Sequence, residues 1–115
     1  MKTILLASLL CVITFLPQAK AGVDLRSKVS RIWQSNGNLH IKMTSTKFDE
    51  YCKPGWFGFN LFIPVSDKNY AYYYGLVTAA LTKDLELYIA NISVFDGSTS
   101  CDVTQTGYGM VLLKP

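Results

Sequence analysis

Apolar residues recur at helical spacing in one segment of the chain, residues 69–84. The residues of this stripe follow one another at intervals of three and four: Tyr70, Tyr73 or Tyr74, Val77 and Leu81. Such a stripe predicts a helix of about four turns with one face packed on a sheet. We expect Asp67 or Ser66 to cap the first turn. Leu76 and Ala79 lie on flanking faces, which predicts that a second side of the helix is also covered.

Before this helix, polar and apolar residues alternate in two segments, 27–34 and 39–44, as in strands. The Asn36-Gly37 pair between them predicts a hairpin with a type I′ turn, in which both central residues have positive φ. In the second strand the apolar positions share one face, which we expect in the core: Leu39, Ile41 and Met43.

A third strand is expected over residues 55–65. Its predicted inner face carries Phe57, Phe59, Leu61 and Ile63, and its other face Trp56, Gly58, Asn60 and Phe62. Pro64 marks the end of the strand, because proline has no N–H to donate.

Two more strands are expected after the helix. Residues 85–95 change phase near Ala90-Asn91, which predicts a β-bulge, and residues 107–113 form the last strand after a turn at 96–98. The resulting order is β-β-β-α-β-β. It predicts a mainly β fold with one helix (α+β), a small five-stranded Greek-key barrel of the OB type.

The first 21 residues have the features of a secretory signal peptide. Lys2 precedes an apolar run, residues 4–16, and Ala19-Lys20-Ala21 gives a small-x-small cleavage site. We therefore expect residues 1–21 to be removed and residues 22–115 to form a single domain. The apolar run is too short for a membrane span, so a secreted or periplasmic protein is expected.

Removing that segment changes the charge. The chain has 11 basic and 8 acidic residues, and without Lys2 and Lys20 the net charge is 9 − 8 = +1. No Lys/Arg-dense face is present to neutralise phosphates, so we expect no nucleic-acid partner.

Two cysteines remain in the predicted mature chain, Cys52 and Cys101. An even pair in an oxidising compartment predicts a disulfide, and a small domain benefits from one. The alternative is a reactive Cys52 thiolate, which would need a base nearby.

The sequence provides few groups for catalysis or metal binding. His40 is the one histidine and lies on the outward phase of a strand, which favours a solvated residue over a catalytic base. Asp49 and Glu50 are adjacent and favour a solvated loop over a glycosidase pair. We therefore expect no catalytic residues, no metal site and no cofactor.

Aromatic residues are more numerous than a small barrel can bury easily. Tyrosine and tryptophan stack on sugars and anchor protein interfaces, so we take four of them as candidate binding residues: Trp33, Trp56, Tyr72 and Tyr108. The alternative is that these rings pack in the core or against the helix.

The chain resembles short exported proteins of Gram-negative bacteria that share a V-x-x-I…N-G-x-L-x-I opening and a late G-S-x-S-C segment. Here the opening is Val29, Ile32, Asn36, Gly37, Leu39 and Ile41. In strand order and size the chain is also similar to the B subunits of AB5 toxins, which are secreted OB-fold domains that form pentameric rings and bind cell-surface glycans. No sugar-binding residue of those subunits can be aligned with this sequence.

This resemblance, together with the aromatic residues, implies a secreted, non-catalytic binding module that binds glycans as a ring-forming homo-oligomeric subunit. The alternative is a secreted or periplasmic inhibitor or accessory protein that docks on another protein through the same rings.

Overall fold

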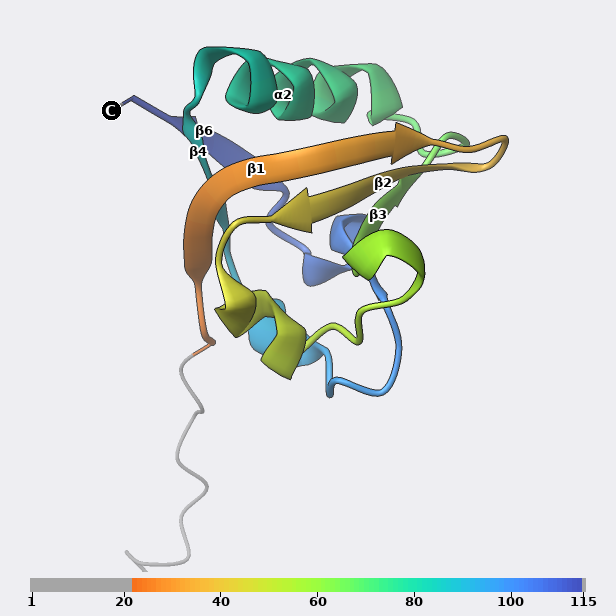
Figure 1. Ribbon diagram of the computed structural model, residues 1–115, viewed down its shortest axis with the longest axis vertical. Helices are drawn as coiled ribbons and strands as arrows, with labels where there is room; N and C mark the ends of the chain where they lie inside the picture. Colours follow the sequence, from red (N-terminus) through yellow and green to blue (C-terminus); the bar gives the residue numbers. More distant parts are fainter. Residues whose placement is uncertain (1–21, 115) are drawn as a thin grey trace, which may run out of the picture.

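The computed structural model describes residues 22–114, so the predicted signal peptide lies outside the described residues. The described part is mainly β with one α-helix, as predicted (Figure 1). Its strands are β1 (Leu25–Gln34), β2 (Asn38–Met43), β3 (Leu61–Pro64), β4 (Glu86–Ile89), β5 (Cys101–Asp102) and β6 (Met110–Leu113), and its helix is α2 (Tyr70–Lys83). The strands form one sheet in the order β5-β3-β2-β1-β4-β6. The prediction of five strands was wrong, because the two-residue strand β5 carries no readable alternation.

The long strand β1 gives the sheet its curl. Its second half pairs with β2 and its first half pairs with β4, both antiparallel. The pairing with β2 shifts register between Val29 and Arg31, and such an irregularity increases the local bend. Figure 1 shows β1 bending between the two arms of the sheet, which forms a curled half-barrel.

The β1–β2 hairpin was predicted correctly, but its turn was not. Leu39, Ile41 and Met43 are buried, as expected for the inner face. Neither Asn36 nor Gly37 has positive φ, so the turn is not type I′. The Ser35 hydroxyl closes the turn instead: it accepts a hydrogen bond from the Asn38 N–H at 3.2 Å and donates to the Asn38 carbonyl at 3.1 Å.

The third strand is shorter than predicted. Leu61 and Ile63 are fully buried and Pro64 ends the strand, in agreement with the sequence pattern. Residues Trp56–Gly58 form a 3₁₀ turn instead of a strand, and Phe57 within it has a left-handed φ of 56°. Phe57 was expected in the core but is 65% exposed.

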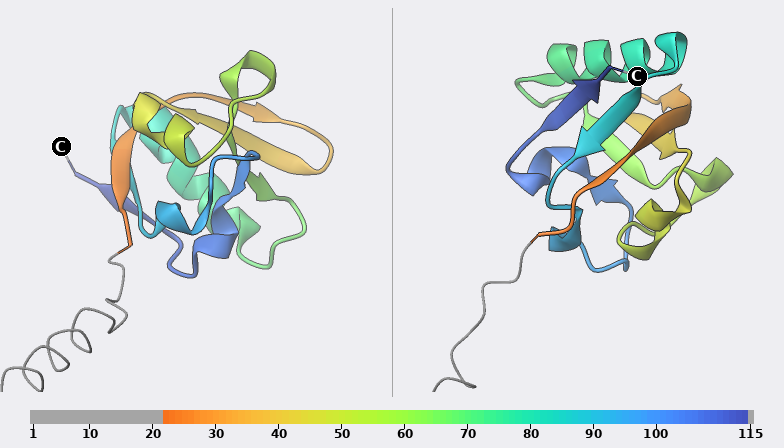
Figure 2. Two further views of the ribbon diagram at one scale, coloured as in Figure 1. Left: turned by 90° about the horizontal axis from the view of Figure 1, so that it is seen from below. Right: turned by 90° about the vertical axis from the view of Figure 1, so that its left-hand side faces the viewer.

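Helix α2 lies along one side of the curled sheet, and the short 3₁₀ segments lie on the side away from it (Figures 1 and 2). Val77 and Ala80 are buried against the strands. The other helix residues packed against the core are partly buried: Tyr70, Tyr73, Leu76 and Leu81. The predicted stripe is thus correct, except that Tyr74 is 44% exposed and Leu76 belongs to the inner face.

The predicted cap of this helix lies two or three residues too early. The N-cap residue is Asn69, whose side chain makes no capping bond. Asp67 accepts the Asn69 N–H with Oδ1 at 2.8 Å and the Tyr70 N–H with its carbonyl. Asp67 therefore closes the turn that leads into the helix.

After the helix, β4 ends at Ile89, six residues before the end of the predicted strand at residue 95. Asn91 adopts a left-handed φ of 60° and starts a 3₁₀ turn over Ile92–Val94, which buries Ile92. The change of phase therefore marks the end of a strand, and the predicted β-bulge was wrong. The chain then adds β5 parallel to β3 and β6 antiparallel to β4.

Candidate functional site

Five rings come together at the hairpin end of the sheet, and we name them the aromatic cluster: Trp33, His40, Trp56, Phe57 and Phe59. Trp33 stacks on His40 with ring centroids 4.5 Å apart and an interplanar angle of 19°. Trp56 contacts Trp33 at a centroid distance of 4.6 Å and an angle of 56°. Two of the four predicted binding residues, Trp33 and Trp56, therefore belong to one site.

Strand pairing brings the first two rings together. Trp33 on β1 is directly opposite His40 on β2, and both point to the outer face of the sheet. Directly opposed residues of an antiparallel pair are close enough for their rings to stack. The remaining rings come from the segment before β3. Within the cluster Phe59 is buried, while Trp33 is 38% and Trp56 63% exposed.

The segment that carries Trp56 and Phe57 is tightly hydrogen-bonded. The Gly55 N–H donates to the Phe59 carbonyl at 2.9 Å, and the Phe59 N–H donates to the Trp56 carbonyl at 3.1 Å. From β1, Arg31 donates through Nε at 3.0 Å and through Nη2 to the Phe57 carbonyl. These bonds hold exposed rings in a fixed backbone.

An open cavity of about 310 Å³ lies beside the cluster. Its lining residues are Trp33, His40, Lys53, Pro54, Gly55, Trp56, Phe59 and Ser100. Burial lowers the pKa of His40 below its ordinary value of 6.5, so the neutral form of its ring predominates at pH 7. Lys53 then carries the one formal charge among these described lining residues, which include no carboxylate.

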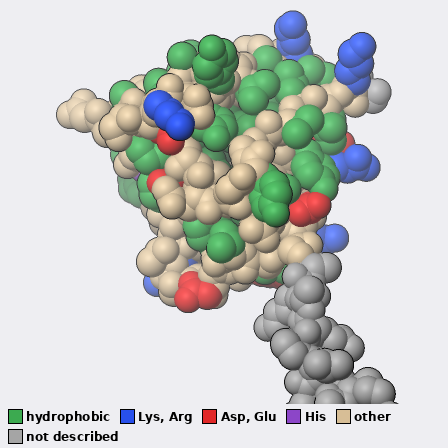
Figure 3. Space-filling view, turned by 180° about the vertical axis from the view of Figure 1, so that it is seen from behind, with side chains coloured by type: hydrophobic (Ala, Val, Ile, Leu, Met, Phe, Trp, Pro, Cys, Tyr) green, Lys and Arg blue, Asp and Glu red, His purple; other side chains and the backbone are tan. Residues whose placement is uncertain are grey.

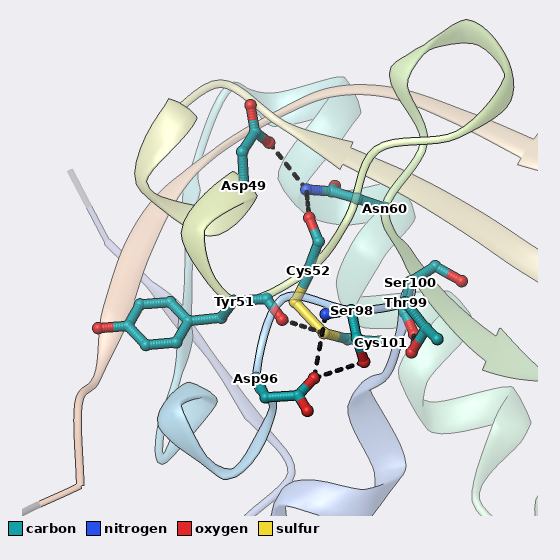
Figure 4. Close-up of a disulfide and its surroundings, with 9 residues drawn as sticks. All are labelled: Asp49, Tyr51, Cys52, Asn60, Asp96, Ser98, Thr99, Ser100 and Cys101. Atoms are coloured by element: carbon teal, nitrogen blue, oxygen red, sulfur yellow. Dashed lines mark hydrogen bonds between the residues drawn. A yellow bond between two sulfur atoms is a disulfide. The ribbon is translucent and has the colours of Figure 1, made fainter.

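The predicted disulfide Cys52–Cys101 is confirmed (Figure 4). It joins the two segments that form one wall of this cavity. Lys53 and Ser100, the neighbours of the two cysteines, both line the cavity. The Lys53 N–H donates to the Thr99 carbonyl at 2.8 Å, which joins the two segments through their backbones as well.

Asn60, the buried residue directly before β3, supports this wall. Its Nδ2 donates to Asp49 Oδ1 at 2.8 Å and to the Cys52 carbonyl at 3.1 Å (Figure 4). Asp49, expected in a solvated loop, also pairs with Lys42 at 2.8 Å. Asn60 Oδ1 is buried and finds no hydrogen-bond partner among the described residues.

The other two predicted binding residues do not line the cavity. Tyr72 lies on α2 and is 76% exposed, and Tyr108 is 73% exposed. Tyr108 lines a second open cavity of about 390 Å³ together with Gly22, Asp24, Ala90 and Asn91. Figure 3 shows the face opposite that of Figure 1, where hydrophobic side chains are spread among scattered charged ones.

His40 is less solvated than the sequence pattern indicated. It lies on the outward phase of β2, but the stacked Trp33 ring and Phe59 partly bury it. Its Nε2 is 3.2 Å from the Ser35 hydroxyl, the distance at which a base can activate a nucleophile. That hydroxyl also bonds both backbone groups of Asn38, and no hydrogen bond to a carboxylate orients the ring within residues 22–114.

Between residues 22 and 114, no three His, Cys, Asp or Glu side chains are grouped so that they could hold a metal ion. No helix in that range is long and apolar enough to cross a membrane.

No protein-family model, curated protein or solved structure matches this chain. The aromatic cluster and its cavity therefore carry the functional argument.

Sequence reasoning missed several residues of this site: Arg31, His40, Lys53, Phe57, Phe59 and Ser100. One of them could have been found. A hairpin turn over residues 35–38 places residue 33 opposite residue 40, so the Trp33–His40 pair follows from the predicted register. The others depend on the disulfide and on the 3₁₀ turn, which bring together segments far apart in the sequence.

Proposed function

We propose that this protein is a secreted, non-catalytic binding module that binds a saccharide at the aromatic cluster. The observation that carries the proposal is the contact between two exposed tryptophans, Trp33 and Trp56, at the rim of a cavity. Indole rings present large apolar faces on which the C–H groups of a sugar ring can stack, and their N–H groups can bond its hydroxyls.

The arrangement of the two indoles favours a ligand that places one sugar ring against the pair. Their centroids are only 4.6 Å apart and their planes are inclined by 56°, so each cannot stack on a different sugar of an extended chain. Together they form an angled niche. Lys53 and Ser100 at its edge can supply hydrogen bonds to hydroxyl groups.

The charge of the niche argues against a cationic ligand. Aromatic rings can also bind quaternary ammonium groups, and such a site would resemble this one in its ring content. Lys53 lines the cavity and Arg31 lies 5.7 Å from the Phe59 ring, while no carboxylate is among the described lining residues. A neutral or anionic saccharide fits these charges better.

The strand pairing supports an OB-like barrel as the scaffold. β1 pairs with both β2 and β4, β3 runs parallel to β5, and α2 connects β3 to β4. We interpret β5 and β6 as two halves of the fifth strand of such a barrel, separated by the 3₁₀ turn over Val103–Thr106. This interpretation agrees with the resemblance to the B subunits of AB5 toxins.

A glycan array probed with residues 22–115 tests the proposal. We expect binding to a subset of glycans, and Trp56→Ala should weaken it by at least about tenfold, which corresponds to about 1.4 kcal/mol. Trp56 is 63% exposed, so the variant should fold. Tyr108→Ala, which removes an exposed ring outside the cluster, is the control. Absence of glycan binding, or equal binding by Trp56→Ala, would overturn the proposal.

The alternative is docking on another protein through the same rings. It is favoured by Phe57, which is 65% exposed beside Trp56, because adjacent exposed rings are typical anchors of protein interfaces. A protein partner whose binding is abolished by Phe57→Ala, combined with an array that shows no glycan binding, would support this function over the first.

A further inference from the structure

The backbone of Phe57 adopts a conformation that its side chain disfavours. Its φ of 56° and ψ of 19° lie in the left-handed region, which bulky residues seldom occupy. Such conformations persist only when the surroundings enforce them, and they are concentrated at functional sites. The group that holds Phe57 in this left-handed conformation therefore affects the shape of the adjacent saccharide site.

Arg31 is in the right position to do so. Its Nε and Nη2 both donate to the Phe57 carbonyl, so two N–H groups of the guanidinium bind one oxygen atom. The same guanidinium lies 5.9 Å from the centroid of the Phe57 ring and 5.7 Å from that of the Phe59 ring, within the range of cation–π contacts. Arg31 takes part in none of the ion pairs of residues 22–114.

The neighbouring residue is adapted to this contact. A Cβ atom on Gly58 would lie 2.9 Å from Arg31 Nη2, closer than such atoms approach, and the φ of Gly58 is +79°. Glycine at position 58 thus leaves room for the guanidinium and allows the chain to turn.

Arg31 and Trp33 also share the outer face of β1, two residues apart. β1 therefore carries both Trp33, whose ring contacts Trp56, and Arg31, which binds the segment that contains Trp56. The register shift of β1 against β2, between Val29 and Arg31, lies directly before this pair.

We propose that Arg31 is a positioning residue of the saccharide site: by fixing the Phe57 carbonyl, it directs Trp56 toward Trp33 and keeps the niche formed before a ligand arrives. The ligand-binding part of this inference rests on the proposed function, whereas the positioning part does not. Without the guanidinium, Phe57 can relax to negative φ, and Trp56 moves away from Trp33. The free protein then has to restore the niche on binding, which lowers affinity.

Two measurements on Arg31→Ala test the proposal, and one of them needs no ligand. Two indoles 4.6 Å apart give an exciton couplet in far-ultraviolet circular dichroism, which we expect in the wild type and not in Arg31→Ala. The affinity for the strongest array glycan should fall by about tenfold or more. The thermal midpoint should change little, because Arg31 is exposed.

Arg31→Lys and Arg26→Ala complete the set. The lysine variant keeps the charge but lacks the planar fork of two donors, so it should not restore the couplet. Arg26 lies on the same strand, is exposed and pairs with Glu86 at 3.9 Å, so Arg26→Ala should keep both the couplet and the affinity.

The outcomes separate this inference from the proposed function. A couplet and affinity that persist in Arg31→Ala would overturn the positioning role, even if Trp56→Ala abolishes glycan binding. Full rescue by Arg31→Lys would also overturn it, since charge alone would then suffice. Loss of the couplet in Arg31→Ala, with no glycan bound by the wild type, would confirm the positioning role and reject the saccharide function.

Discussion

Gly37 and Gly97 both lie in turns, but their surroundings differ. Gly37 has no left-handed φ, and a Cβ atom there would meet no atom within 4 Å. Gly97 has a φ of +83°, and a Cβ atom would lie 2.7 Å from the Glu50 carbonyl oxygen. The sequence alone pointed to Gly37 as the sensitive position, because Asn-Gly is typical of type I′ turns.

We therefore predict opposite effects of alanine at these positions. Gly37→Ala should leave the free energy of unfolding unchanged or raise it by about 0.4–1 kcal/mol, because alanine restricts the unfolded chain. Gly97→Ala should lower it, because of both the backbone strain and the contact with Glu50. Urea unfolding of the two variants measures the difference, and a larger loss for Gly37→Ala would contradict the turn described here.

His40 predicts a dependence of stability on pH. Burial lowers its pKa below the ordinary value of 6.5, so the unfolded chain binds a proton at a pH where the folded protein does not. The groups around it are Trp33, Ser35, Phe59, Phe62 and the cationic Lys53, and none of these is an acid that would favour a charged imidazole.

The free energy of unfolding should therefore be fully retained above about pH 6.5 and should decrease as the pH falls from there toward the lower pKa of the folded state. His40→Gln should remove this part of the pH dependence. Urea unfolding at pH 7 and pH 5 for both proteins measures it. Asp24 and Asp96, whose pKa values are lowered by hydrogen bonds, change the free energy of unfolding only in more acidic solution. Both residues are present in the wild type and in His40→Gln, so they do not affect the comparison. Identical slopes would contradict the prediction.

At the scale of elements, β3 provides a test of where the strand begins. The sequence places Phe57 and Leu61 on the same inner face, whereas the structure exposes the first and fully buries the second. Leu61→Ala should lower the free energy of unfolding by about 2–5 kcal/mol, as removal of a buried leucine does. Phe57→Ala should change it by less than about 0.5 kcal/mol. Comparable losses in chemical denaturation would mean that the strand extends to Phe57.

The disulfide joins the segment before β3 to strand β5. Both cysteines are fully buried, and 49 positions separate them. Closing a loop of this length should stabilise the fold by about 4 kcal/mol, a large share of the roughly 5–15 kcal/mol expected of a domain. The double variant Cys52→Ala/Cys101→Ala should therefore have a much lower thermal midpoint, while a reducing agent should not affect it.

The same variant should also bind ligand more weakly, because Lys53 and Ser100 flank the two cysteines and line the cavity. Thiol labelling of both cysteines in native wild-type protein would show that the bond is absent in solution.

At the scale of the whole molecule, the resemblance to ring-forming subunits predicts self-association, and the structure changes the residues that could mediate it. Leu76 packs partly on the core and is a poor choice for an interface. Tyr72 on α2 and Val111 on the edge strand β6 are exposed instead, at 76% and 51%. Unpaired edge strands are ready sites for pairing with a second chain.

Sedimentation velocity should therefore show an oligomer, and Tyr72→Glu should dissociate it without changing the circular dichroism spectrum. Thr82→Glu, on an exposed position of the same helix, is the matched control. A wild-type protein that sediments as a monomer would contradict the ring. The proposed saccharide site does not depend on the ring, because the aromatic cluster and its cavity form within a single chain.

The sequence by itself determined the parts of this protein that depend on local spacing. Alternation located β1 and β2 and the buried face of β2, since successive side chains of a strand point to opposite sides. Helical spacing located α2, and the parity of cysteines gave the disulfide. For the strands and the helix, the spacing of apolar residues within a short segment shows which face must be buried. No knowledge of distant segments is needed to predict these elements.

Only the tertiary structure decided the rest. Phe57 leaves the expected strand because Arg31, 26 residues earlier, binds its carbonyl and holds its backbone at a left-handed φ. β5 forms from two residues because the disulfide and β3 hold it in place. The cavity combines β1, β2 and the two segments that the disulfide joins. These features arise from contacts between distant segments. The periodicity of one segment does not indicate which distant residue will contact that segment.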